Sequence, residues 1–188
     1  MTRTNVTASS RPQTADAVTA GSGSSRMRRG LVILPVVLAL GLAPVSTASA
    51  PLPFEKAITR MALNARVNKE APKSSPITAS DDVYAAGARI YRNNCAVCHG
   101  LPGQEQTAIA MGEFPKPPNL FKGKGVTDDP VGVIYWKVAN GIRLTGMPGF
   151  SSSLSNDQMW QVSLLLMNAD KLPPAVRTIL QAPLPQAQ

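Results

Sequence analysis

Two cysteines and the only histidine of this 188-residue chain lie within five consecutive positions, Cys95-Ala96-Val97-Cys98-His99. At this spacing the two thiols can add to the two vinyl groups of one haem, and the histidine that follows can bind the haem iron. The chain has no other cysteine or histidine. The run therefore predicts one covalently attached haem, with Cys95 and Cys98 as attachment residues and His99 as an iron ligand.

Other chemistries use paired cysteines, and each explains less of this run. A thioredoxin-like redox pair expects a preceding strand and a βαβ pattern, and neither is visible. A closed zinc site needs four ligands, whereas two cysteines and one histidine supply three. A short structural disulfide would leave His99 without a role.

An electron-carrying haem needs a second axial ligand, and methionine is the usual choice once a second histidine is excluded. Met147 lies in a loop rich in Gly and Pro, residues 145–150, which can hold a sulfur atom rigidly. Met111 is the alternative, but it follows His99 by only twelve residues, which leaves little chain to cross the haem plane. Four other methionines lie in less suitable places, in the N-terminal segments or on an apolar helix: Met27, Met61, Met159 and Met167.

Helical patterns flank the motif, and no segment has the period of a strand. Asp81 and Asp82 suit the start of the first core helix, by capping and by attraction to the helix dipole. Gly87 lies on the apolar stripe of this helix, which predicts a close crossing with another helix. Residues 101–125 are rich in Gly and Pro and predict a long loop that can wrap a haem.

Two further helices follow this loop. Asp129-Pro130 predicts a helix with proline at its first position, running to Asn140 and ending at Gly141. Ser155 and Gln158 form the pattern of a capping box, which predicts an apolar and largely buried last helix that carries Trp160. Upstream of the motif, the spacing of apolar residues predicts a short amphipathic helix over residues 53–69.

In these features the chain resembles the class I c-type cytochromes. The resemblance covers about residues 80–172. The matching blocks are, in the family order, residues 87–91, 95–100, 118–120, 140–142 and 146–150, followed by the helix with Trp160. It implies an all-α cytochrome c fold, in which three to five short helices wrap around one covalently attached haem c.

The resemblance also implies roles for single residues. His99 matches the proximal iron ligand and Met147 the distal one. Pro118 matches the proline whose carbonyl oxygen accepts a hydrogen bond from the proximal histidine ring. Tyr91 and Leu120 lie in matching blocks and are expected at the cofactor. For Arg143 two interpretations remain, a partner of a haem propionate or an ordinary solvent-exposed side chain.

Residues 26–50 have the pattern of an export signal, with a basic start, an uncharged apolar stretch and the small-residue end Ala48-Ser49-Ala50. Translation starts at Met1 or at Met27. Pro51 is unfavourable directly after a cleaved bond, although cleavage after Ala48 avoids it. An uncleaved segment is the alternative, because the uncharged run of residues 30–54 exceeds the roughly 20 residues that a membrane helix needs.

Four segments are therefore expected. They are an N-terminal extension with signal peptide or uncleaved anchor (1–50), a lead-in segment (51–80), the haem domain (81–172) and a Pro-rich tail (173–188). The haem domain is expected in the periplasm, either soluble or anchored through the N-terminus.

The charge of the chain bears on its partners. The formal net charge is +8, and residues 1–50 contribute half of it, since 5 Arg face 1 Asp there. Nucleic-acid binding is not supported, because the protein is expected to be exported. Four lysines cluster in sequence and form either an ordinary solvated face or a docking patch for an acidic redox partner. They are Lys116, Lys122, Lys124 and Lys137.

A haem iron with both axial positions filled transfers electrons without binding a substrate. The sequence therefore predicts an electron carrier, not an enzyme, that moves single electrons between periplasmic or membrane redox partners. One alternative is an electron-transfer subunit of a larger dehydrogenase or oxidase complex. Another is a haem peroxidase or gas-binding haem protein, which Met147 and the single haem motif disfavour.

Overall fold

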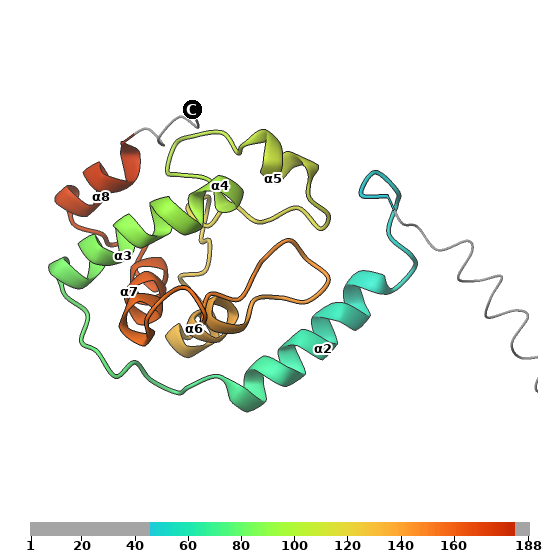
Figure 1. The fold of residues 1–188 in the computed structure, drawn as a ribbon, viewed down its shortest axis with the longest axis horizontal. Helices are drawn as coiled ribbons and strands as arrows, with labels where there is room; N and C mark the ends of the chain where they lie inside the picture. The colour runs from blue at the N-terminus through green and yellow to red at the C-terminus, as the bar shows by residue number, and fades with distance from the viewer. Residues whose placement is uncertain (1–45, 183–188) are drawn as a thin grey trace, which may run out of the picture. The chain divides into compact units, whose positions relative to one another are not determined.

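The computed structural model describes residues 46–182, and every regular element in this part of the chain is a helix (Figure 1). The expected all-α fold is confirmed. Five helices, α3 to α7, fall within residues 81–172, in agreement with the three to five expected there. The helices are α2 (Glu55–Glu70), α3 (Asp81–Asn94), α4 (Ala96–His99), α5 (Ala108–Gly112), α6 (Val131–Asn140), α7 (Asn156–Met167) and α8 (Pro174–Gln181).

The described residues include only the end of the predicted export segment. Residues 1–45, with both candidate start positions Met1 and Met27, lie outside them, as do residues 183–188. Between residues 46 and 182 no helix combines the length and the apolar character needed to cross a lipid bilayer.

Helix α3 begins where the sequence predicts, but its capping oxygen comes from another residue. The side chain of Ser80 accepts a hydrogen bond from the backbone N–H of Val83 at 3.3 Å. Asp81 and Asp82 occupy the first turn, where the helix dipole stabilises their negative charges. Because the Ser80 hydroxyl already accepts the hydrogen bond from the N–H of Val83, Asp81 and Asp82 stabilise the helix through their charge and not as caps.

Helices α3 and α7 cross closely at Gly87. A Cβ atom added to this glycine would lie 2.4 Å from the carbonyl oxygen of Gln161 and 3.1 Å from the Cβ of Leu165. Any side chain would hold the two backbones apart. The predicted close crossing is confirmed.

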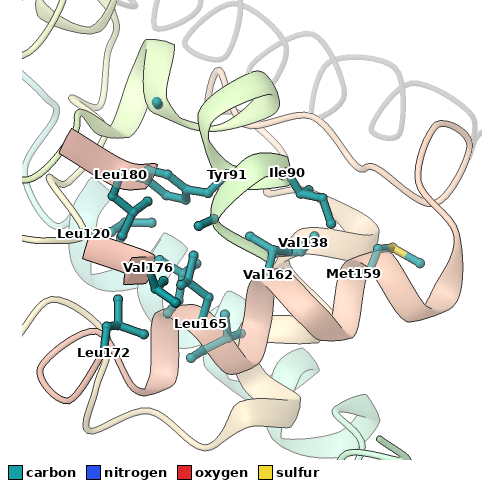
Figure 2. Packing of buried hydrophobic residues seen from close by; sticks show 14 of the residues in the cluster. Ile90, Tyr91, Leu120, Val138, Met159, Val162, Leu165, Leu172, Val176 and Leu180 are labelled. Atoms are coloured by element: carbon teal, nitrogen blue, oxygen red, sulfur yellow. The ribbon is translucent and has the colours of Figure 1, made fainter. Parts of the chain in front are cut away.

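Helix α7 is the central element of the core. Ser155 and Gln158 form the predicted capping box, with bonds of 3.2 and 2.8 Å. Trp160 is buried and stacks on Tyr135 of α6, with ring centroids 4.0 Å apart. Figure 2 shows the apolar side chains of α7 packed against those of neighbouring helices. The expected burial on most sides is confirmed by the buried residues Met159, Trp160, Val162, Ser163, Leu164, Leu165 and Leu166.

Helix α8 lies in the segment expected as a Pro-rich tail, where no helix is predicted. It packs on α3. Val176 and Leu180 are fully buried, and Figure 2 shows them within the cluster that α3 and α7 form. From α3, the guanidinium group of Arg92 donates a hydrogen bond to the carbonyl oxygen of Ile179 at 2.7 Å. The start of this segment is therefore part of the core.

Helix α6 runs to Asn140 as predicted, and Pro130 directly precedes its first residue. Gly141 then ends the helix with a φ of 67°, a backbone conformation that favours glycine. The predicted loop of residues 101–125 contains the short helix α5, which Thr107 caps through a bond from the N–H of Ala110. Of the side chains in this loop, Leu101, Ala110 and Leu120 are buried.

Helix α2 confirms the amphipathic helix expected over residues 53–69, with bounds shifted by one or two residues. Val67 is its only buried residue. The helix contacts α6 and no other described helix. At this contact the indole N–H of Trp136 donates to the carboxylate of Glu70 at 3.3 Å.

Candidate haem site

The two cysteines and the histidine form a single helical turn. Cys95 follows α3 as its C-cap and precedes α4 as its N-cap. Its carbonyl oxygen accepts hydrogen bonds from the N–H groups of Cys98 and His99, both in α4, at 3.1 and 2.9 Å. Both cysteines carry free thiols, so the structural disulfide considered from the sequence does not form here.

Burial raises the pKa of both thiols. It raises the pKa of Cys95 to about 12, and the nearby charge of Cys98 adds to this rise. The pKa of Cys98 is also raised, first by burial and then by a hydrogen bond to the carboxylate of Glu113 at 3.3 Å and by its charge. A thioredoxin-like pair needs a thiol with a lowered pKa. Neither cysteine has such a lowered pKa, which argues against that alternative.

The His99 ring is oriented by the main chain. Its Nδ1 lies 2.8 Å from the carbonyl oxygen of Pro118. Since a carbonyl oxygen can only accept a hydrogen bond, Nδ1 carries a proton, and in the neutral ring the free lone pair is then on Nε2. This is the tautomer that a metal-binding histidine needs.

A glutamine that the sequence patterns do not identify holds this acceptor in place. The side-chain amide of Gln106 donates to the carbonyl oxygen of Pro117 at 2.9 Å and to that of Cys98 at 3.3 Å. These two bonds connect the segment that contains Pro117 and Pro118 to the turn that contains Cys98. No motif marks a single glutamine in a loop, so the sequence gives no signal for this role.

Tyr91 and Leu120 lie in the apolar core. Tyr91 contacts the end of the turn formed by residues 95–99, which we call the motif turn. The phenol of Tyr91 is fully buried and donates to the carbonyl oxygen of Gly100 at 2.7 Å. Burial, followed by the charge of Cys95, raises the pKa of this phenol well above its ordinary value. Its ring meets that of Phe121 edge to face, with centroids 5.0 Å apart. Leu120 belongs to the same buried cluster. Both residues thus support the motif turn from the core.

Met147 lies in a closed loop between α6 and α7. The N–H of Ile142 donates a hydrogen bond to the carbonyl oxygen of Met147 at 3.1 Å. The N–H of Phe150 donates to the carbonyl oxygen of Val138, in α6, at 2.9 Å. A Cβ atom on Gly141 would lie 2.5 Å from the backbone nitrogen of Gly149. The two ends of the loop therefore touch, and this contact fixes the backbone around Met147.

The remaining methionines and Arg143 have different surroundings. Met111 is 52% exposed at the end of α5, and Met159 is buried in the core as expected for a packing residue. Arg143 is exposed and forms no ion pair with residues 46–182.

Glu113 connects the cysteine turn to the methionine loop, and sequence reasoning missed it. Its carboxylate accepts a hydrogen bond from the thiol of Cys98. It also lies against Gly146, where an added Cβ atom would come within 2.4 Å of Oε2. The turn that carries His99 and the loop that carries Met147 therefore face a common space.

The donor set of this space suits a haem. Two thiols lie one helical turn apart, an imidazole follows them with its Nδ1 held by a carbonyl oxygen, and a thioether lies in the loop between α6 and α7. Within residues 46–182 no group of three or more His, Cys, Asp and Glu side chains is arranged to hold a metal ion. The fit to a covalently attached haem rests on Cys95, Cys98 and His99, which share one turn.

Two members of the predicted lysine cluster have acidic partners. Lys124 pairs with Asp128 and Lys137 with Asp129, each at 3.0 Å. Lys116 and Lys122 form no ion pair within residues 46–182. The local carboxylates reduce the positive charge that this cluster can present to a partner.

Comparisons with known proteins identify the family of the chain. Residues 82–164 match the family described as cytochrome c oxidase, cbb3-type, subunit III. The chain is 33% identical to cytochrome c6 of Limnospira maxima over 84 residues, which are 45% of this chain and 90% of that protein.

Among solved structures, the chain is similar to part of the Kuenenia stuttgartiensis reducing HAO-like protein complex Kustc0457/Kustc0458. The TM-score is 0.45 at 25% identity, over 53% of this chain and 49% of that one, so this chain spans about half the length of that relative. The family match and the similarity to cytochrome c6 establish the family. The chain belongs to the c-type cytochromes, whose covalently bound haem c is its cofactor.

Proposed function

We propose that the chain is a mono-haem electron carrier, not itself an enzyme, that transfers single electrons between periplasmic or membrane redox partners. When bound, haem supplies a one-electron couple between ferric and ferrous iron. Cys95 and Cys98 would hold it through thioether bonds, and His99 and Met147 would bind its iron. An iron held by both residues would transfer electrons without binding a substrate.

The bond between His99 and Pro118 carries this proposal. It leaves Nε2 as the only free lone pair of the ring, at the end of the turn that holds both thiols. The methionine loop supports the proposal, because its closed backbone can hold a thioether in one place. A soft thioether sulfur favours ferrous iron and raises the reduction potential.

Other residues take supporting roles in the proposal. Tyr91 holds the carbonyl of Gly100 at the end of the motif turn, and Leu120 forms part of an apolar wall beside the cofactor. Arg143, which is exposed, is available to a haem propionate. The haem domain covers residues 81–172, and residues 1–50 direct it to the periplasm.

Two measurements on the purified protein test the proposal. Extraction with acidified acetone should leave the pigment on the polypeptide, because thioether bonds survive it. The ferric spectrum should show the weak charge-transfer band of a sulfur–iron bond. This band should vanish in Met147→Ala and persist in the matched variant Met111→Ala.

The opposite results would contradict the proposal at separate points. A colourless polypeptide after extraction would exclude covalent attachment. A band lost only in Met111→Ala would transfer the distal role to that residue. Carbon monoxide binding to the unmodified ferrous protein would show a displaceable ligand and favour the gas-binding or peroxidase alternative.

A second candidate function is an electron-transfer subunit of a larger oxidoreductase complex. It is favoured by the family match, since that family is described as a subunit of a cbb3-type oxidase. Native electrophoresis of mildly solubilised membranes tests it. Comigration of the haem signal with a larger redox complex would support the subunit, whereas migration as a single chain would support the free carrier.

A further inference from the structure

The N-terminal half of α2 presents an apolar stripe that no part of the described protein covers. We define the α2 stripe as Phe54, Ile58 and Met61, which are 79%, 61% and 70% exposed. Leu52, directly upstream, is 51% exposed. Single exposed apolar residues are common, but a contiguous set marks an interaction site.

The geometry of α2 excludes its own domain as the partner of this stripe. Ile58 and Val67 are nine residues apart, and at about 100° per residue they lie on opposite sides of the helix. Val67 is the buried residue, and the contact with α6 lies at the C-terminal end, where Glu70 meets Trp136. The stripe therefore points away from α6, the one helix among the described residues that α2 contacts.

Figure 1 shows α2 running along the edge of the helices from its contact with α6 toward residues 46–54. The sequence upstream continues the apolar character of the stripe. Residues 30–54 contain no charged side chain over 25 positions, and this run ends at Phe54, the first residue of the stripe. The opposite side of the same turns carries Lys56 and Arg60.

We propose that the α2 stripe docks on the surface of a lipid bilayer, with α2 lying in the plane of the interface. A helix with aromatic and aliphatic residues on one side and basic residues on the other is typical of such binding. Helix α2 itself is too short and too polar to span a bilayer. Docking would hold the haem domain beside the membrane, whether or not the upstream run is cleaved.

A lipid surface fits this stripe better than a protein does. A stable protein–protein interface uses about 20–30 residues on each side, whereas the stripe with Leu52 offers four. A bilayer accepts a narrow apolar stripe, and the basic side chains on the remaining surface of the helix favour anionic lipids.

Hydrogen exchange of the α2 amides tests the proposal on the haem-loaded protein, as processed by a host that attaches haem. The probe is a vesicle of phosphatidylglycerol and phosphatidylcholine. Since the N-terminal half of α2 packs on nothing else within residues 46–182, its amides should exchange rapidly in solution. On vesicles, exchange over residues 55–63 should slow by at least about fivefold.

A double variant and a matched control separate apolar docking from charge. Ile58→Glu/Met61→Glu places two charges on the stripe, and Ala57→Glu/Asn64→Glu places the same two charges on exposed positions beside it. The stripe variant should lose the slowed exchange, and the control should keep most of it. Because all four positions are exposed, both variants should melt like the unmodified protein.

Three outcomes would overturn the proposal. Exchange unchanged by vesicles would show that the stripe does not dock. Equal loss of the slowed exchange in both variants would show that the added negative charge, and not the loss of apolar contact, weakens binding to the vesicles. Slowed exchange without vesicles that grows with protein concentration would assign the stripe to a second copy of the chain. None of these outcomes depends on the haem ligands, so the test is independent of the proposed function.

Discussion

The buried phenol of Tyr91 connects the stability of the motif turn to pH. It donates to the carbonyl oxygen of Gly100, and burial keeps it protonated in the folded protein. In the unfolded chain a tyrosine ionises near pH 10. A pKa raised by folding therefore gives stability that is complete below about pH 10 and is lost as the pH rises above it.

We predict that Tyr91→Phe lowers the free energy of unfolding by about 1–3 kcal/mol at neutral pH, because a buried carbonyl loses its donor. The difference in free energy of unfolding between the variant and the unmodified protein should become smaller above about pH 10. There the phenol of the unmodified protein ionises in the unfolded chain, which stabilises the unfolded state. Denaturant titrations at neutral and alkaline pH measure both effects. Tyr135→Phe is the control, since its hydroxyl bonds to Asn156 at an exposed position. A difference that stays constant with pH would contradict this account.

Single residues differ in how well the sequence identifies them. Cys95, Cys98 and His99 form a motif whose spacing reflects covalent chemistry, and Pro118 follows from the resemblance to the family. Glu113 and Gln106 have no such spacing, because their partners are a thiol and backbone carbonyls brought near only by folding. Contacts of this kind can be found from coordinates alone.

At the crossing of α3 and α7, the two helix backbones leave no room for a methyl group. We predict that Gly87→Ala destabilises the protein by about 1–3 kcal/mol or more, since its Cβ would meet the backbone of Gln161. Gly112→Ala, in α5, meets nothing within 4 Å and should be neutral or stabilising by up to about 1 kcal/mol. Thermal melts of both variants measure the contrast, and equal effects would show that the crossing is not close.

The loop around Met147 depends on a contact between its two ends. We predict that Gly141→Ala weakens or abolishes the sulfur–iron charge-transfer band, because a Cβ at this position would collide with Gly149 and open the loop. Gly123→Ala is the matched control: its φ is also positive, at 65°, but no atom lies within 4 Å. It should cost about 1–2 kcal/mol of stability through backbone strain and keep the band. Loss of the band in both variants would mean that unfolding, not loop opening, removes the sulfur.

The helices show where sequence patterns reach their limit. Helices α6 and α7 carry strong end signals, and the structure confirms both. Helix α8 has eight residues between prolines, and its burial depends on α3, a partner some 80 positions away in the sequence. Helix α5 is shorter still. For α2, the spacing of apolar residues predicts a helix but not which side of it packs. The side with Val67 packs on α6, and the apolar stripe lies on the other side.

Across the described chain, the apolar core is unevenly distributed. Most buried side chains come from α3, α6, α7 and α8, and residues 96–130 contribute few. The motif turn, α5 and the methionine loop instead leave apolar side chains exposed, namely Val97, Ile109, Met111 and Leu144. These side chains lack an apolar cover among residues 46–182, whereas a haem between them would supply one.

We therefore predict a graded response to removal of the cofactor. In Cys95→Ala/Cys98→Ala, which cannot form thioether bonds, the amides of α3, α7 and α8 should keep measurable protection from hydrogen exchange. Those of residues 101–130 should exchange near the rate of an unfolded chain, because their few buried contacts cannot offset the entropy of ordering a long loop. Residues 142–150, whose backbone hydrogen bonds close the loop, should keep partial protection. Hydrogen exchange with mass spectrometry resolves these segments. Uniform loss of protection would show that the helices cannot fold without haem, and uniform retention would show that the loops need no cofactor to hold their form.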